Sequence, residues 1–172
     1  MSAAPTLSAP APPDDKELVN ILTLGEVKVK VSSGTSKEAK NILTEDPESC
    51  WTSDNLAPNS DPCSSRYLIS FKLAQTIRIS ALHSISLTFA GGFSPMSLNV
   101  LGSEQDGKTW FAIGDDEVLH PKDTNAKQYF DVHNLVQTDT RFAGWLRFQF
   151  NGSTDDYGRI TVYGTQIFAI LT

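Results

Sequence analysis

Residues 84–103 read SISLTFAGGFSPMSLNVLGS, and this stretch decides the fold class. Apolar side chains recur at every second position on both sides of the glycine pair, at Ile85, Leu87, Phe89, Leu98 and Val100. A period of two is typical of a β-strand with one buried face. Adjacent glycines mark a sharp turn in the backbone. The stretch therefore predicts two strands whose connection contains Gly91 and Gly92.

The same pattern continues outward over most of the chain. Alternating or short apolar runs predict further strands over residues 27–31, 67–71, 77–79, 110–113, 129–132, 146–150 and 160–170. We expect a kink in the last run at Gly164. Residues 36–41 and 134–138 suit only a turn or two of helix. About eight strands in one domain predict an all-β fold, an antiparallel jelly-roll β-sandwich.

Length and charge restrict the class of function. The chain has 172 residues, of which 40% are apolar and 20% charged, with a net charge of −6. This length suits a single domain, and the apolar content suffices for a core. Direct binding to nucleic acid or to an anionic membrane rests on positive charge, so we expect neither partner. No apolar run reaches the length of a membrane span.

The N-terminal segment differs in composition from the rest. Four of the nine prolines fall within residues 1–15, among Ala and Ser, which predicts a disordered tail over residues 1–19 and a folded domain over residues 20–172. Because the start lacks the features of a signal peptide, we expect an intracellular protein, nuclear, cytoplasmic or both. In that reducing environment Cys50 and Cys63 are expected as thiols, with a disulfide as the alternative.

Signatures of catalysis are missing from the sequence. It contains no phosphate-binding glycine loop, no nucleophile elbow and no helix with paired zinc-binding histidines. The three histidines lie in unrelated contexts. We therefore expect no enzymatic activity and no cofactor.

The order of several motifs resembles the discoidin family, also called the coagulation factor V/VIII C-type or galactose-binding-like domain. These motifs are Cys50-Trp51-Thr52-Ser53-Asp54, the turn SEQDGKTW at residues 103–110, and ITVYG at residues 160–164. The turn is one residue longer than the usual form. Gly91-Gly92-Phe93-Ser94 and Asp156-Tyr157-Gly158-Arg159 add a narrower similarity, over residues 20–172, to the nuclear-receptor-associated protein family.

The discoidin resemblance implies a jelly-roll sandwich that binds without catalysis, through loops at one end. The narrower resemblance implies a protein partner and a nuclear or cytoplasmic location. The first hypothesis is accordingly a protein-interaction module. The alternative is a carbohydrate-binding module or cytosolic lectin. A third is a substrate-recruiting module like the Doc domain of the cell-division ubiquitin ligase, which shares the discoidin fold.

We expect the three motif loops to converge at one end of the sandwich and form a binding site. Phe93 either contacts a partner from the loop tip or folds back to plug the barrel. Arg159 either clamps a loop carboxylate such as Asp54 or Asp156, or presents its fork to an acidic partner. The candidate ligand-binding or partner-binding residues are Gly91, Gly92, Phe93, Tyr157, Asp155, Asp156, Arg159 and Asp54.

Three further motif residues are expected to have structural roles. Trp51 suits the core, Cys50 suits a small buried packing position, and Ser53 suits a hydrogen bond to loop backbone.

Many discoidin-like domains hold a structural calcium ion with an Asp before the Trp-x-Ser motif and a Glu in the last strand. The corresponding positions here are Thr44 and Gln166, which leaves Asp46 and Ser49 as weak candidate ligands. Since two carboxylates are lost, we expect calcium binding to be weak or absent.

Overall fold

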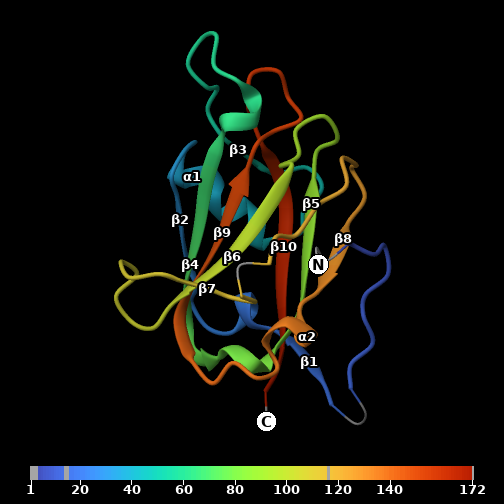
Figure 1. Ribbon diagram of the computed structural model, residues 1–172, viewed down its shortest axis with the longest axis vertical. Helices are drawn as coiled ribbons and strands as arrows, with labels where there is room; N and C mark the ends of the chain where they lie inside the picture. Colours follow the sequence, from blue (N-terminus) through green and yellow to red (C-terminus); the bar gives the residue numbers. More distant parts are fainter. Residues whose placement is uncertain (1–3, 14–15, 116, 172) are drawn as a thin grey trace.

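The computed structural model describes residues 4–13, 16–115 and 117–171, and these residues form two facing antiparallel β-sheets (Figure 1). The described strands are β1 (Leu18–Asn20), β2 (Lys28–Val31), β3 (Trp51–Thr52), β4 (Arg66–Arg78), β5 (Leu82–Phe89), β6 (Ser97–Ser103), β7 (Phe111–Ala112), β8 (Gln128–Asp131), β9 (Phe142–Asn151) and β10 (Thr161–Ile170). Sheet A has the order β2-β4-β9-β6-β7. Sheet B has the order β1-β10-β5-β8, with β3 also paired to β10. The predicted antiparallel sandwich is confirmed. It has more strands than the eight or so expected, because it includes several very short ones.

Helical segments are short. They are α1 (Ser36–Ala39), α2 (His133–Val136) and the 3-10 turns η1 (Ile21–Thr23), η2 (Lys40–Leu43), η3 (Pro62–Ser64) and η4 (Ile79–Ala81). Among the described residues, no helix has the length and apolar character needed to span a bilayer. Both predicted helical turns are present, at α1 with η2 and at α2.

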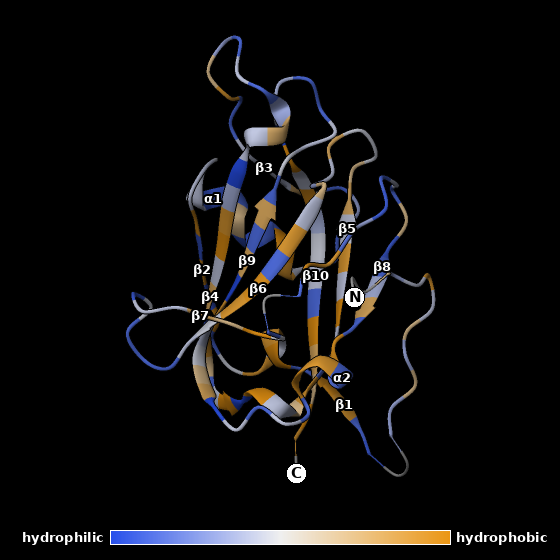
Figure 2. Ribbon diagram, viewed as in Figure 1, coloured by the Kyte–Doolittle hydropathy of each residue, from blue (hydrophilic) through white to orange (hydrophobic). Residues whose placement is uncertain are grey.

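The core lies between the sheets and follows from the alternation along each strand (Figure 2). Phe89 of β5 meets Phe150 of β9 edge to face across the two sheets, with ring centroids 5.7 Å apart. Phe71 and Phe148 meet in the same way at 5.6 Å within sheet A. These four rings are fully buried. Edge-to-face pairs of this kind stabilise a core beyond their area alone.

Two strands differ in detail from the sequence pattern. The run predicted at 67–71 and the first two residues of the run at 77–79 belong to one strand, β4, whose pairing with β9 is irregular between Lys72 and Ile77; Ile79 begins η4. The pairing of β10 with β5 shifts register between Val162 and Gly164, where the kink was expected.

The N-terminal boundary also differs. Strand β1 begins at Leu18, so the predicted start of the domain at residue 20 falls inside a strand paired with β10. Further upstream, Thr6 forms a bridge with Tyr129 of β8, with N–H···O distances of 2.9 and 2.8 Å. Residues 1–3, 14 and 15 of the expected tail lie outside the described residues. Its disorder stays a prediction.

Segments 53–58, 90–96 and 152–160 meet at one end of the sandwich, at the top of Figure 1, and we call them the loop end. The Ser53 N–H donates to the Ile160 carbonyl at 2.9 Å, and the Ile160 N–H donates to Ser53 Oγ at 2.9 Å. The Leu56 N–H donates to the Tyr157 carbonyl, also at 2.9 Å. The Thr154 N–H donates to the Ser94 carbonyl at 2.9 Å, so the expected convergence of the three motif loops is present.

Replacing Gly158 with Ala should destabilise the loop end strongly. Gly158 has φ +78°, and an added Cβ would lie 2.5 Å from Leu56 Cδ1. We expect Gly158→Ala to lower the free energy of unfolding by about 2–3 kcal/mol. Gly92→Ala is the matched control, since Gly92 has φ +87° with nothing within 4 Å of the added carbon. Its cost should be about 1 kcal/mol. Equal costs in urea unfolding would contradict this account.

Candidate functional site

The motif Gly91-Gly92-Phe93-Ser94 forms a tight turn that is stabilised by hydrogen bonds within the chain. The Phe93 N–H donates to the Ala90 carbonyl at 2.9 Å and closes the turn. The Gly91 N–H donates to Asn125 Oδ1 at 2.6 Å, and the Gly92 N–H donates to Asp123 Oδ1 at 2.7 Å. The donors of both glycines are thus used within the chain. A partner reaching this turn meets backbone whose N–H groups already have acceptors.

Asp123 links its own loop to the loop after β5, and it was not among the residues predicted from the sequence. Its Oδ1 also accepts a hydrogen bond from Ser94 Oγ at 2.9 Å. Ser94 in turn receives the N–H of Thr154 on its carbonyl at 2.9 Å. The signal that could have found Asp123 and Asn125 is their residue type, since Asp and Asn often accept backbone N–H groups at turns.

Arg159 lies at the centre of the candidate site. Its Nε donates to Asp155 Oδ2 at 3.0 Å, and its backbone N–H donates to the same oxygen at 3.1 Å. Its guanidinium carbon lies 5.0 Å from the ring centroid of Phe93 and 5.7 Å from that of Tyr157. These distances suit cation–π attraction on both sides. Tyr157 is 64% exposed, whereas Phe93 is half-buried.

The partner expected for Arg159 was wrong in part. The sequence offered Asp54 or Asp156 as the clamped carboxylate, but the structure pairs Arg159 with Asp155. The turn closed by the Gly158 N–H on the Asp155 carbonyl, at 2.9 Å, brings residues 155 and 159 together.

Asp155 and Arg159 hold each other in their charged forms. Burial acts to raise the pKa of the Asp155 carboxyl, but hydrogen bonds from Arg159 and its positive charge outweigh this effect, so the pKa lies below its ordinary value. The hydrogen bond to Asp155 raises the pKa of Arg159. At neutral pH the site therefore presents a fixed guanidinium.

The other candidate carboxylates do not join this cluster. Asp54 Oδ2 accepts the N–H of Gly34 at 3.2 Å, and the Asp54 carbonyl accepts the hydroxyl of Tyr67 at 2.9 Å. Asp54 thus holds the loop between β2 and α1. Asp156 is exposed, and its carboxylate has no partner within the part of the chain that the structure describes.

The three residues expected to be structural contribute to the fold to different degrees. Trp51 is fully buried and donates its Nε1–H to the Ser33 carbonyl at 3.1 Å. Ser53 is buried and pairs with Ile160 as described above. Cys50 is only half-buried rather than a buried packing residue, because it precedes the strand at a surface turn. Both cysteines are free.

The positions that correspond to a calcium site use their oxygens within the chain. Thr44 Oγ1 donates to the Asn41 carbonyl at 2.8 Å, and Gln166 Oε1 accepts from Ser86 Oγ at 3.0 Å. Asp46 Oδ1 accepts the N–H of Glu48 at 2.9 Å, and Ser49 Oγ lies 3.5 Å from Thr44 Oγ1. Over residues 4–13, 16–115 and 117–171, no cluster of three or more His, Cys, Asp or Glu side chains suits a metal.

A pocket of about 390 Å³ lies beside the loop end, on the outer side of sheet B, and was not anticipated. It is lined by Glu45, Pro47, Thr88, Asn125, Tyr163 and Gly164. Glu45 Oε2 pairs with Lys127 Nζ at 3.1 Å, while its buried Oε1 has no partner among the described groups. The pocket thus offers a carboxylate oxygen, an amide and two hydroxyls.

Replacing Asp155 with Asn should destabilise the protein at neutral pH and reduce its sensitivity to acid. Because the folded pKa of Asp155 is lowered from 3.8, its contribution is present above pH 3.8 and is lost as the pH falls further. We expect Asp155→Asn to lower the free energy of unfolding by about 1–2 kcal/mol at neutral pH. Asp156→Asn is the control and should change nothing. Urea unfolding at neutral and acidic pH measures both; an equal effect of the two variants would refute the clamp.

Calcium should have little effect on this protein. The expected ligand positions carry Thr and Gln, and their oxygens already have partners in the chain. Isothermal titration of chelator-treated protein should show no micromolar affinity for calcium. A saturable heat with a rise in melting temperature would show that these residues rearrange to hold the ion.

Comparison with known proteins finds relatives of this chain by sequence. No family model matches the chain. The Nuclear receptor 2C2-associated protein of Xenopus laevis is 31% identical over 151 residues, which cover 85% of this chain and 95% of that protein.

Solved structures agree on the fold. One is CpGH89CBM32-5 from Clostridium perfringens in complex with GalNAc-β-1,3-galactose, with a TM-score of 0.59, 12% identity, and coverage of 83% of this chain and 95% of that one. Another is the family 32 CBM from C. perfringens NanJ in complex with galactose, with a TM-score of 0.60, 8% identity, and coverage of 83% and 93%. These likenesses confirm the galactose-binding-like fold, and the sequence relationship decides the family. The chain belongs to the family of nuclear receptor 2C2-associated proteins.

Proposed function

We propose that this chain is a non-catalytic protein-interaction module, intracellular, whose partner docks on the loop end. The observation that carries the proposal is the position of Arg159, held by Asp155 between Phe93 and Tyr157. Tyr and Arg are the residue types that dominate binding energy at protein interfaces. Here both lie in the segment 152–160 of the loop end, with the guanidinium 5.7 Å from the tyrosine ring centroid.

Asp155 holds the side chain of Arg159 in place before a partner binds. Asp155 occupies only the Nε and backbone N–H of Arg159, and the two outer nitrogens have no hydrogen-bond acceptor among the described residues. They remain available for a carboxylate or a main-chain carbonyl of the partner. Since the guanidinium is already fixed, little side-chain entropy is lost on docking.

A protein partner fits the loop end better than a sugar does. A sugar needs several free donors and acceptors around an aromatic ring, but Ser94 Oγ, Asp155 Oδ2 and the two glycine N–H groups are already bonded within the chain. The name of the relatives also supports a protein partner, and nuclear receptor 2C2 is the first candidate to test. A nuclear or cytoplasmic location is part of this proposal.

Carbohydrate binding is the second candidate. It is supported by the similar structures solved with galactose and with GalNAc-β-1,3-galactose. Within this chain, the pocket beside Glu45 offers the hydroxyl and amide groups that such a ligand requires.

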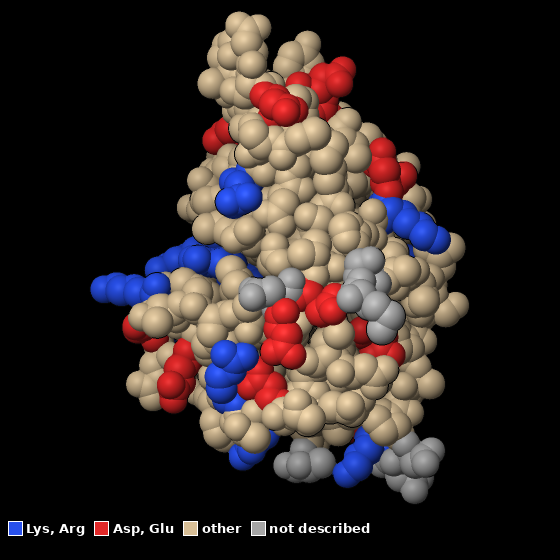
Figure 3. Space-filling view, viewed as in Figure 1, with Lys and Arg blue, Asp and Glu red and all other residues tan. Residues whose placement is uncertain are grey.

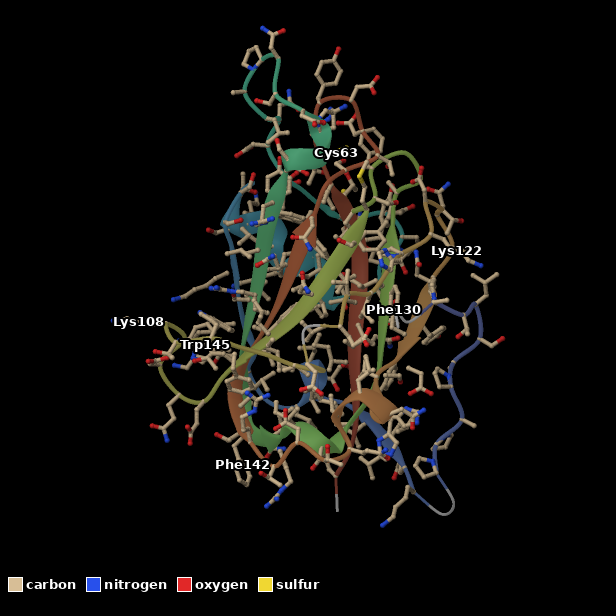
Figure 4. The ribbon with its side chains drawn as sticks, in the orientation of Figure 1. Cys63, Lys108, Lys122, Phe130, Phe142 and Trp145 are labelled. Carbon is tan, nitrogen blue, oxygen red and sulfur yellow. The ribbon has the colours of Figure 1, made fainter. Side chains whose placement is uncertain are left out.

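Tyr157→Ala should weaken partner binding by about tenfold or more, because it removes an exposed aromatic side chain from the centre of the tip. Arg159→Lys keeps the charge but loses the planar fork, and it should weaken binding as well. Phe142→Ala is the matched control, since Phe142 is 43% exposed and lies at the opposite end of the sandwich (Figure 4). Binding to purified nuclear receptor 2C2 and proximity labelling in native cells provide the measurements.

Two results would count against this proposal. Partners that label wild type and Tyr157→Ala equally would remove the loop end as a docking site. Saturable binding on a glycan array, with no protein partner, would favour the carbohydrate alternative.

A further inference from the structure

A second surface, on the outer face of sheet A, gathers positive charge in an ordered way. Two neighbouring rows cross the strands there. In one row Lys28 of β2 lies opposite Lys72 of β4, which lies opposite Trp145 of β9. In the next row Lys30 and Arg147 stand on either side of Ser70. We call Lys28, Lys30, Lys72 and Arg147 the cationic face.

Two tryptophans organise these cations. The Nζ atoms of Lys30 and Lys72 lie 5.1 and 5.9 Å from the ring centroid of Trp145. The guanidinium of Arg147 lies 3.7 Å from the ring centroid of Trp110. Trp110 meets Trp145 edge to face at 6.4 Å. Cation–π attraction therefore holds three cations in place on one sheet face.

Within the part of the chain that the structure describes, none of these cations forms an ion pair. Among the described residues, the ion pairs are Glu45 with Lys127, Asp139 with Arg141 and Asp155 with Arg159, and none involves the cationic face. Arg147 donates its Nε–H to Ser70 Oγ at 2.7 Å, and no carboxylate of the described residues forms an ion pair with it. Burial lowers the pKa of Arg147, as expected for a cation partly removed from water.

This arrangement is costly in the free protein. Like charges directly opposite each other on a sheet, as at Lys28 and Lys72, destabilise the pairing. Lysines on an edge strand often serve to block unwanted strand pairing, which accounts for Lys28 and Lys30 on β2. Protection of a sheet edge does not explain Lys72 and Arg147, because they lie on the interior strands β4 and β9.

We propose that the cationic face docks an acidic segment of a partner protein. Strands are about 4.8 Å apart and alternate residues about 7 Å apart, so the four cations span about 10 Å by 7 Å, enough for two or three carboxylates. The charge complementarity is local, since the chain as a whole carries −6. Carboxylates here would relieve both the lysine repulsion and the uncompensated charge of Arg147.

Nucleic acid is the less favoured occupant. Bases bind such surfaces by stacking on free aromatic rings. Trp145 is only 8% exposed and is contacted by two lysines, and the ring of Trp110 carries the guanidinium of Arg147.

Figure 3 shows Lys and Arg side chains gathered beside the β6–β7 loop, and Figure 4 places Trp145 there, well away from the loop end.

The test uses a short fluorescein-labelled peptide of alternating Glu and Gly, read by fluorescence anisotropy against the full chain. We expect saturable binding that weakens with added salt. Lys30→Gln with Lys72→Gln should weaken it by about tenfold, and should leave the melting temperature unchanged or raised, because repulsion is removed. Lys40→Gln with Lys122→Gln is the control, with the same charge change elsewhere, and should retain wild-type affinity.

Several outcomes would overturn the proposal. These are no saturable binding of the Glu peptide, equal binding of a matched Gln peptide, equal loss in the control variant, or tighter binding of an oligothymidylate than of the Glu peptide. Tyr157→Ala should leave peptide binding unchanged, so this proposal and the proposed function of the loop end fail separately.

Discussion

The hydrogen-bonded pair of Asp155 and Arg159 fixes the end of the molecule on which our account of function depends. One carboxylate oxygen accepts both the Nε–H and the backbone N–H of Arg159. The guanidinium is thereby placed between Phe93, which comes from the loop after β5, and Tyr157, which comes from the loop after β9. The pair lies within the loop after β9, and the guanidinium it holds contacts Phe93 of the loop after β5. Beneath it, the Ser53 N–H donates to the Ile160 carbonyl and Ser53 Oγ accepts the Ile160 N–H, which joins the two loops.

Much of the fold follows from the sequence, because the alternation of apolar residues indicates which face of each strand is buried. The kink near Gly164 and the convergence of the motif loops were likewise predictable. Alternation does not state which strands pair or in which register. The like-charged opposition of Lys28 and Lys72 therefore emerges only from the structure. The same holds for Asp123, whose contact with Gly92 spans 31 residues, and for Asp155, which was expected to face a ligand and instead holds Arg159.

Fold and family carry different information here. The two carbohydrate-binding modules described above share the sandwich at 12% and 8% identity, and so they define the architecture alone. The sequence relationship over 95% of a relative's length establishes membership of the nuclear receptor 2C2-associated protein family. The sandwich then offers two chemically distinct surfaces, an aromatic and arginine tip at the loop end and a cationic face on sheet A. Two separate surfaces allow one small domain to contact two partners, or two parts of one partner.

Site-specific photocrosslinking tests most directly whether a protein docks on the loop end. A photoreactive phenylalanine analogue would replace Tyr157 in one sample and Phe142, at the opposite end, in another. Our account predicts that irradiation in native cells yields a discrete crosslinked protein from position 157 and not from position 142. The same crosslinks from both positions, or none from position 157, would contradict it.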